Sequence, residues 1–155
     1  MVALCLLRRV DRGAVDLEAP VATYWPEFAQ AEKQATTIRQ VLGGMAGLMY
    51  PDHAPESSIL DWNAMVLALA KQKPEWEPGS RGAYHSSTQG YLLGEILRRV
   101  DGRPFDQFFA EEVATPLGVD FKFGLSDEDI TRVADLIPNR DSTTIREIPT
   151  PGSNL

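Results

Sequence analysis

Cysteine and histidine are scarce in this sequence, with one cysteine and two histidines among 155 residues. A single cysteine excludes an internal disulfide framework and every zinc site built from several cysteines. Cys5 lies in an apolar run and is expected to be a small buried hydrophobe. His53 has no second histidine at the spacing of a metal site, so we expect neither a metal nor any other cofactor.

Long apolar runs and an excess of positive charge are also absent. No stretch approaches the roughly 20 apolar residues of a membrane-spanning helix. The apolar start is followed, rather than preceded, by Arg8 and Arg9, which is not the order of a secretory signal, so a cytoplasmic location is expected. The net charge of −7 argues against binding to nucleic acid or to an anionic membrane.

The overall composition is typical of a globular chain, with 43% hydrophobic and 24% charged residues. Its length suits one domain with a real core. From Asp135 onward the chain is polar, contains prolines and has no period. We therefore expect a folded region of residues 1–136 followed by an irregular tail of residues 137–155.

The most informative stretch is residues 76–103, which contains a turn and then a helix. Pro78 and Gly79 predict the turn, because proline presets φ and glycine allows a sharp bend. The helix is predicted over residues 87–100. Its apolar residues recur on one face: Leu92, Leu93, Ile96, Leu97 and Val100.

Both ends of this helix carry signals. Ser86 and Gln89 have capping-box spacing, so Ser86 is expected to cap the first turn. Gly102 follows the last turn and is expected to end the helix. Tyr84 is thereby held just before a helix N-terminus, where backbone donors gather. His85, between Tyr84 and Ser86, is expected at the surface or behind these two residues.

Further helices are predicted over residues 1–10, 37–42 and 59–71, and from Pro104 to the breaker sequence Pro116-Leu117-Gly118. Thr37 and Gln40 form a second capping box. Ser58 and Asp61 are expected to cap the helix of residues 59–71. Its buried stripe is expected to be Ile59, Trp62, Val66 and Leu69. A short strand is predicted over residues 121–124.

The central stretch reads W-E-P-G-S-R-G-A-Y-H-S and continues as G-Y-L-L-G-E-I to Gly102. It resembles the middle of the serine β-lactamase-related family, which contains class C β-lactamases, penicillin-binding proteins and similar esterases. By this resemblance Tyr84 is the tyrosine that handles the proton of a nucleophilic serine, and Ser86 is the second polar residue of the motif. The Y-H-S form is more similar to the esterase branch.

The resemblance covers roughly residues 4 to 136 in collinear order. R-G-A-V-D-L-E-A-P-V, I-R-Q-V-L-G-G-M-A-G-L and P-L-G match further segments of the family pattern. Gly44 stands where the family usually has histidine. The histidine's role there is expected to be structural, so its replacement leaves the fold possible.

A serine acylation mechanism also needs a nucleophile, a base and donors for the oxyanion. The family supplies them from S-x-x-K and from a K-T-G-type strand, and neither motif occurs here. We therefore expect an internal fragment of the domain, without the nucleophile helix motif and without the C-terminal strands, that is inactive alone.

The expected fold is a mainly α segment, the helical subdomain portion of a β-lactamase/penicillin-binding-protein-like α/β fold. The family implies a small-molecule ester or lactam-like substrate. An alternative is a catalytically dead helical module that binds a partner, and a fragment with uncovered apolar faces would form homo-oligomers. A third reading, a different hydrolase pairing some serine with His85, lacks a G-x-S-x-G elbow.

Overall fold

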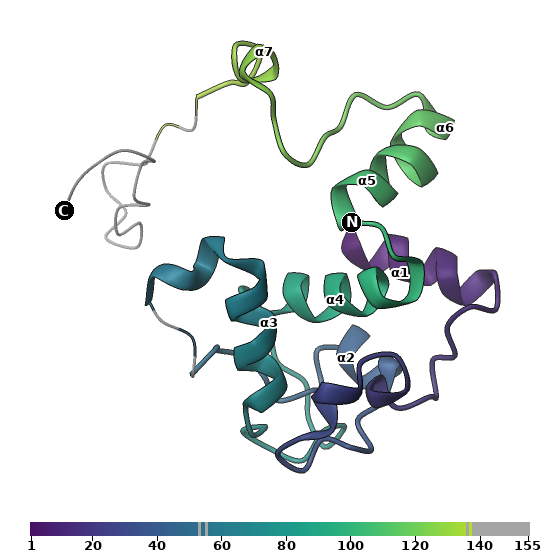
Figure 1. The fold of residues 1–155 in the computed structure, drawn as a ribbon, viewed down its shortest axis with the longest axis vertical. Coiled ribbons are helices and arrows are strands. Elements are labelled where there is room, and N and C mark those ends of the chain that lie inside the picture. Colours follow the sequence, from purple (N-terminus) through teal and green to yellow (C-terminus); the bar gives the residue numbers. More distant parts are fainter. Residues whose placement is uncertain (53, 55, 136, 138–155) are drawn as a thin grey trace. The chain divides into compact units, whose positions relative to one another are not determined.

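The computed structural model describes residues 1–52, 54, 56–135 and 137 (Figure 1). Helices are the only regular secondary structure in this part of the chain, which confirms the expected mainly α segment. In chain order they are α1 (Val2–Asp11), η1 (Val21–Thr23), η2 (Pro26–Ala29), α2 (Ile38–Leu42), η3 (Glu56–Leu60), α3 (Trp62–Lys71), α4 (Gln89–Asp101), α5 (Phe105–Phe109), η4 (Ala110–Ala114), α6 (Thr115–Leu117) and α7 (Asp127–Ile130).

The chain divides into two compact units, residues 1–123 and residues from Gly124 onward. The second unit contains α7, where Ser126 and Asp129 form a reciprocal capping box. The predicted irregular tail of residues 137–155 lies outside the described residues apart from Ile137.

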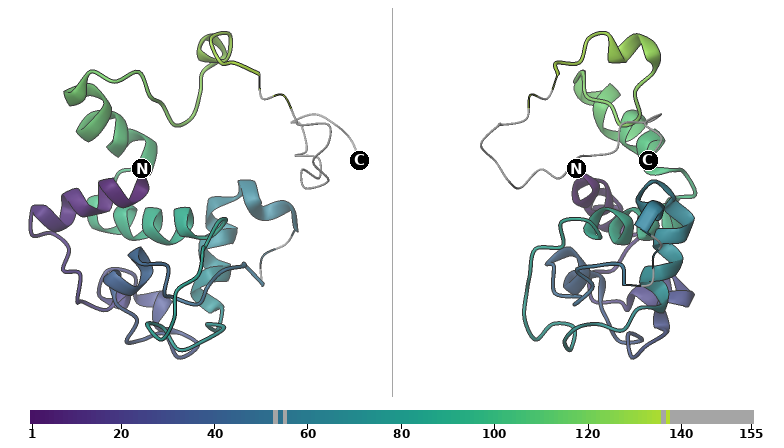
Figure 2. Two further views of the ribbon diagram at one scale, coloured as in Figure 1. Left: turned by 180° about the vertical axis from the view of Figure 1, so that it is seen from behind. Right: turned by 90° about the vertical axis from the view of Figure 1, so that its left-hand side faces the viewer.

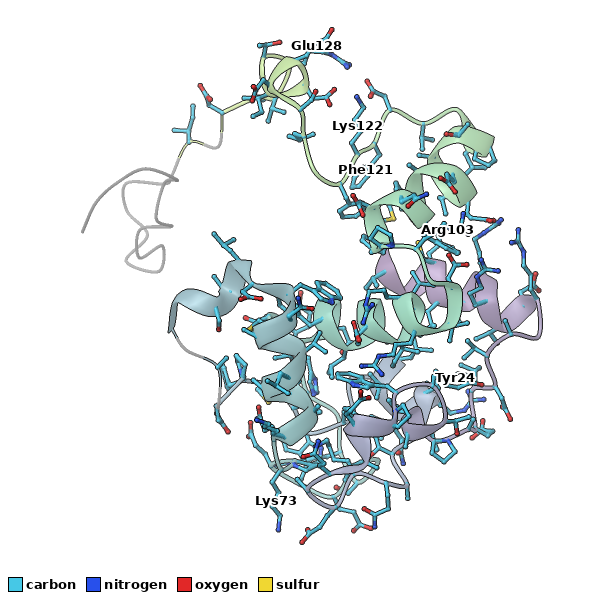
Figure 3. All side chains as sticks on the ribbon, in the orientation of Figure 1. Tyr24, Lys73, Arg103, Phe121, Lys122 and Glu128 are labelled. Atoms are coloured by element: carbon cyan, nitrogen blue, oxygen red, sulfur yellow. The ribbon has the colours of Figure 1, made fainter. Side chains whose placement is uncertain are left out.

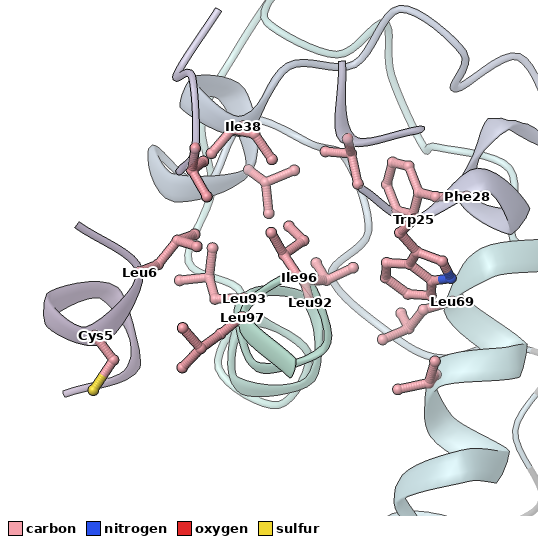
Figure 4. Close-up of a cluster of buried hydrophobic side chains, with 14 of the residues drawn as sticks. Cys5, Leu6, Trp25, Phe28, Ile38, Leu69, Leu92, Leu93, Ile96 and Leu97 are labelled. Carbon is pink, nitrogen blue, oxygen red and sulfur yellow. The ribbon is translucent and has the colours of Figure 1, made fainter. Parts of the chain in front are cut away.

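Helix α4 lies at the centre of the first unit, with α1, α2, α3 and α5 packed around it (Figures 1 and 2). Of the apolar stripe expected from the sequence, Val100 is partly buried and the other four residues are fully buried: Leu92, Leu93, Ile96 and Leu97. Figure 4 shows these side chains between Leu6 and Ile38 on one side and Trp25, Phe28 and Leu69 on the other. Gly102, at φ 87°, ends the helix in the left-handed conformation, as predicted.

Helix α1 forms where it was predicted, and Cys5 is buried in the core as expected. The residues that anchor α1 to α4 are Cys5 and Leu6, both completely inaccessible to solvent. Leu4 and Leu7 lie on the other side and are each 44% exposed. The first unit therefore keeps an apolar strip on the outer face of α1.

The predicted capping box of α2 is confirmed. The Thr37 hydroxyl accepts the Gln40 amide, and the Gln40 side chain accepts the Thr37 amide, at 3.2 and 2.9 Å. These two bonds satisfy orphan donors of the first turn without help from the rest of the fold.

The prediction for residues 59–71 was wrong at its beginning. Residues 56–60 form the 3-10 helix η3, and α3 starts at Trp62 with Asp61 as its cap. Ile59 is 58% exposed instead of buried. The Ser58 hydroxyl contacts the sulfur of Met65. The carboxylate of Asp61 accepts the Ala64 amide at 3.0 Å and so caps the first turn of α3.

Residues 105–117 form one continuous helical run, α5–η4–α6, whose middle turn is a π-helix. The strand predicted over residues 121–124 does not form. Phe121 and Phe123 instead pack edge-on against Phe105 and Phe109, with ring centroids 4.6 to 5.5 Å apart. A single segment without a pairing partner gains more from this aromatic packing than from an isolated strand conformation.

Arginines and carboxylates join α1, α4 and the following helix at the opposite end of α4 from Tyr84. Arg103, which is labelled in Figure 3, donates to Asp101, Glu111 and Glu112. Glu112 also pairs with Arg8 of α1 at 2.9 Å. The net negative chain thus concentrates its paired charges at one junction of three helices.

Candidate functional site

The predicted motif lies in the extended segment immediately before α4. Tyr84 is 86% exposed, and Ser86 is also exposed. Both side chains therefore lie at the surface of the first unit, at the N-terminal end of its central helix. Nothing in the described chain covers the phenol, so it is free to meet a group from elsewhere.

Ser86 does not cap α4, contrary to the prediction. The helix begins at Gln89 and its N-cap residue is Thr88. The Thr88 side chain makes no capping hydrogen bond to the first turn. The side-chain nitrogen of Gln89 donates to the carbonyls of Val41 and Leu42, which directs this side chain toward α2, and its Oε1 makes no capping bond. Tertiary contacts with the α2 region have replaced the local motif.

His85 is buried, with 4% exposure, so of the two expected places, at the surface or behind Tyr84 and Ser86, the surface is excluded. Its Nε2 accepts the Leu48 backbone amide at 3.1 Å, and its Nδ1 lies 2.8 Å from the Ala83 carbonyl oxygen. Because the amide is a donor and the carbonyl an acceptor, the proton resides on Nδ1. Both ring nitrogens are occupied by backbone groups, which argues against a serine–His85 catalytic pair.

A second set of bonds attaches the same segment to residues 44–48. The Ala83 amide donates to the Gly44 carbonyl at 3.0 Å. The buried Thr88 hydroxyl donates to the Leu48 carbonyl at 2.5 Å. Tyr84 therefore stands between two residues, Ala83 and His85, that are both bound to the neighbouring loop.

Gly44 is explained by this close approach. Its φ is 66°, and a Cβ built on it would lie 2.8 Å from the Ala83 oxygen and 3.6 Å from Nδ1 of His85. A side chain at this position would collide with the segment that carries Tyr84. The absence of the histidine usual in the family pattern is thus matched by the presence of His85 in the adjoining space.

Sequence reasoning missed a stack of side chains behind the motif. The guanidinium of Arg81 lies 4.3 Å from the ring centroid of Trp76, and Trp76 meets the His85 ring edge-on at 6.3 Å. The aromatic and cationic residues stand close in the sequence, but no periodic pattern signals the stack because this segment is neither helix nor strand.

Helix α4 is held in place behind the site by a buried carboxylate. Glu95 is completely inaccessible and accepts bonds from Arg98, Arg99 and, at 3.1 Å, from the indole of Trp62. Burial alone would raise the pKa of Glu95, but these hydrogen bonds from two arginines and Trp62 lower it below its ordinary value. Glu95 therefore remains charged and acts as a structural anchor.

An apolar groove of about 530 Å³ lies on a different part of the first unit. It is lined by Met1, Val2, Trp62, Gly90, Tyr91, Phe105, Phe121 and Phe123. None of the three motif residues 84–86 lines it, so the groove and the motif are separate features.

The described residues contain no group of three or more histidine, cysteine or acidic side chains able to hold a metal ion. His53 lies outside the described part of the chain. The site as it stands offers a phenol, a hydroxyl and a stacked guanidinium, which can move a proton or orient a polar substrate but contain no activated nucleophile.

Comparison with known proteins identifies the family of this chain. The family model described as Beta-lactamase matches residues 1–153. The esterase/beta-lactamase LipL of Mycobacterium tuberculosis is 38% identical over 143 residues, which are 91% of this chain and 33% of LipL. The chain belongs to the β-lactamase family.

Solved structures agree with this assignment. A penicillin-binding protein homolog from Caulobacter crescentus has a TM-score of 0.85 at 43% identity, covering 96% of this chain and 40% of that one. A family VIII carboxylesterase has a TM-score of 0.85 at 39% identity, covering 90% of this chain and 39% of that one. The 155 residues thus span well under half the length of these relatives, and correspond to a helical part of the fold.

None of the helices in the described ranges is both long enough and apolar enough to cross a membrane.

Proposed function

We propose that this chain forms the helical part of a serine hydrolase that cleaves esters or β-lactam-like amides through an acyl-enzyme. Tyr84 handles the proton of the nucleophilic serine, and Ser86 accompanies it as the second polar residue of the motif. The observation that carries the proposal is the exposed phenol of Tyr84, fixed at the N-terminal end of the central helix of a β-lactamase-family fold.

The serine itself comes from polypeptide outside these 155 residues, because S-x-x-K is absent from the sequence. The chain alone is therefore inactive, and residues 1–136 constitute a partial domain. The names of the relatives support this class of reaction, since they include an esterase/beta-lactamase and a carboxylesterase. The substrate is a small ester or lactam.

The test compares the 155-residue chain with a version extended upstream through its own reading frame. Hydrolysis of p-nitrophenyl acetate, p-nitrophenyl butyrate and a chromogenic cephalosporin is measured for both. Turnover by the extended version alone supports the proposal, and the preferred substrate distinguishes an esterase from a lactamase.

Tyr84→Phe in the extended version is expected to lower kcat by roughly 10²- to 10⁴-fold, the usual contribution of a positioned acid or base. Tyr50→Phe is the matched control, because Tyr50 is also exposed, at 58%. Neither change should alter folding. If both versions are inert and neither reacts with a fluorophosphonate, the alternative of a catalytically dead binding module is correct.

A further inference from the structure

We propose that His85 and Gly44 form a matched pair that positions Tyr84. The absence of a side chain at residue 44 lets the Ala83 carbonyl lie close to the backbone there, and the two hydrogen bonds of the His85 imidazole fix the backbone on which Tyr84 stands. His85 is thus a positioning residue for the tyrosine, and its effect depends on residue 44 being glycine.

The close packing is evident from the geometry around Gly44. A Cβ there would stand 2.8 Å from the Ala83 carbonyl oxygen, closer than real Cβ atoms approach, and 3.6 Å from Nδ1 of His85, which is an ordinary contact. The Ala83 carbonyl is also the group that the His85 ring binds. A side chain at residue 44 would therefore displace the carbonyl that His85 holds.

The backbone around Tyr84 is held on both sides. Before it, the Ala83 amide donates to the Gly44 oxygen at 3.0 Å. After it, the ring of His85 accepts the Leu48 amide at 3.1 Å and returns a bond to the Ala83 oxygen at 2.8 Å. Because the Tyr84 side chain is itself 86% exposed, its place is set by these neighbours and not by packing of the phenol.

The pair also accounts for glycine at residue 44, because a side chain there would meet the Ala83 carbonyl oxygen. The consequence for catalysis rests on the proposed function of Tyr84, whereas the pairing itself does not.

The first experiment tests the space at residue 44. Gly44→Ala is compared with Gly13→Ala, because Gly13 has a similar φ of 71° but nothing within 4 Å of an added Cβ. Both variants carry the strain of a positive φ, so the difference between them reports the contact. We expect Gly44→Ala to lower the melting temperature by at least about 5 °C more than Gly13→Ala. Equal shifts would overturn the proposal.

The second experiment tests reciprocity with a double-mutant cycle. Gly44→His is measured alone and together with His85→Ser, by thermal melting of the 155-residue chain. If residue 44 and His85 act on the same Ala83 carbonyl, the loss caused by Gly44→His is smaller when position 85 is serine and the carbonyl can move. Additive shifts would show that the two sites are independent and would refute the pair.

The third experiment reads the positioning of Tyr84 directly. ¹⁵N relaxation of the Tyr84 amide should give an order parameter near the rigid value of about 0.85 in the native chain. In His85→Leu it should fall below about 0.6, and His85→Gln, whose amide oxygen reaches toward the Leu48 amide, should restore part of the rigidity. If His85→Leu does not fold, the comparison of His85→Gln with the native chain decides, because Gln lacks the bond to Ala83.

These measurements use no substrate, so their outcome is separate from that of the proposed function. A Tyr84→Phe variant with full ester hydrolysis would refute the catalytic role while leaving the pair intact. A rigid Tyr84 amide in both His85 variants would refute the positioning role whatever the activity.

Discussion

The indole ring of Trp62 lies directly against the backbone of α4 at Gly94. A Cβ on Gly94 would stand 2.5 Å from Cη2 of Trp62. Two carbon atoms that are not linked by bonds do not approach so closely, so the ring or the helix would have to shift. The same indole donates to the buried Glu95 carboxylate at 3.1 Å. This contact joins α3 to the helix that carries the motif, and it requires a residue without a side chain.

Gly94→Ala is therefore expected to destabilise the protein by about 1 to 3 kcal/mol, the usual cost of overpacking. Gly90→Ala is the control in the same helix, because nothing lies within 4 Å of a Cβ there. It should be neutral or stabilising by up to about 1 kcal/mol, since alanine favours helix. Urea unfolding of the three proteins measures both changes. A Gly94→Ala variant as stable as Gly90→Ala would show that Trp62 moves aside freely.

Because the ammonium of Lys33 is buried, we expect the stability of the protein to depend on pH in the alkaline range. Its ammonium is completely buried without a carboxylate and donates to the carbonyls of Gln30, Ala70 and Gln72. Burial lowers the pKa of Lys33 from 10.5 to about 8. Between these two values the unfolded chain binds a proton that the folded chain has released, so stability rises with pH through this window.

Between pH 8 and pH 10.5 the free energy of unfolding is expected to rise by about 3 kcal/mol at most, which is the free energy that corresponds to the lowering of the pKa. Lys33→Met should abolish this rise, whatever its effect at pH 7. Lys73→Met is the control, because the Lys73 side chain is 68% exposed. The free energy of unfolding in urea is measured for each protein across the window. If the free energy of unfolding of Lys33→Met rises with pH as steeply as that of the native chain, the prediction is wrong.

The lowered pKa of Glu112 predicts a loss of stability in acid, so here too stability rises with pH. Hydrogen bonds from Arg8, Arg12 and Arg103 lower the pKa of Glu112 from 4.5 to about 2. Its stabilising effect is complete above pH 4.5 and is lost as the pH falls toward 2. Glu112→Gln should reduce the loss of melting temperature over this range, whereas exposed Glu77→Gln should leave it unaltered. Identical acid profiles for the two variants would contradict the prediction.

The outer face of α1 predicts self-association. Leu4 and Leu7 are each 44% exposed on one helix, and uncovered apolar surface of this kind promotes contact between copies. Leu4→Gln with Leu7→Gln should lower the mass measured by light scattering at high concentration. Leu60→Gln is the control, since Leu60 lies in η3, outside α1, and is 90% exposed. Equal masses for all variants would exclude α1 as the contact.

Local patterns predicted the helices well where the signal and its partner lie within one turn. The capping box of Thr37 and Gln40 formed because both members act on the same few backbone groups. The buried stripe of α4 was correct because its period matches the helix and its width demands a core. The box of Ser86 and Gln89 failed because Gln89 found carbonyls of Val41 and Leu42, which are distant in sequence.

The motif residues were identified by resemblance to the family, but the contacts of the segment that carries them could not be predicted from the sequence. Sequence alone placed Tyr84 before a helix, as observed, but left His85 either at the surface or behind the motif residues. Burial of His85 depends on the Leu48 amide and on the missing side chain of Gly44, about 40 residues earlier. No period or spacing connects these positions, because the contact is between two irregular segments.

The amino-acid sequence by itself determined the helices, the buried face of α4, the family and the absence of a serine nucleophile motif, since these depend on local spacing and composition. Only the tertiary structure decided how the segment of Tyr84 is anchored, where Lys33 buries its charge and which face of α1 stays open. These features arise when segments remote in sequence compete for the same space and the same backbone hydrogen bonds, and that competition is settled by packing.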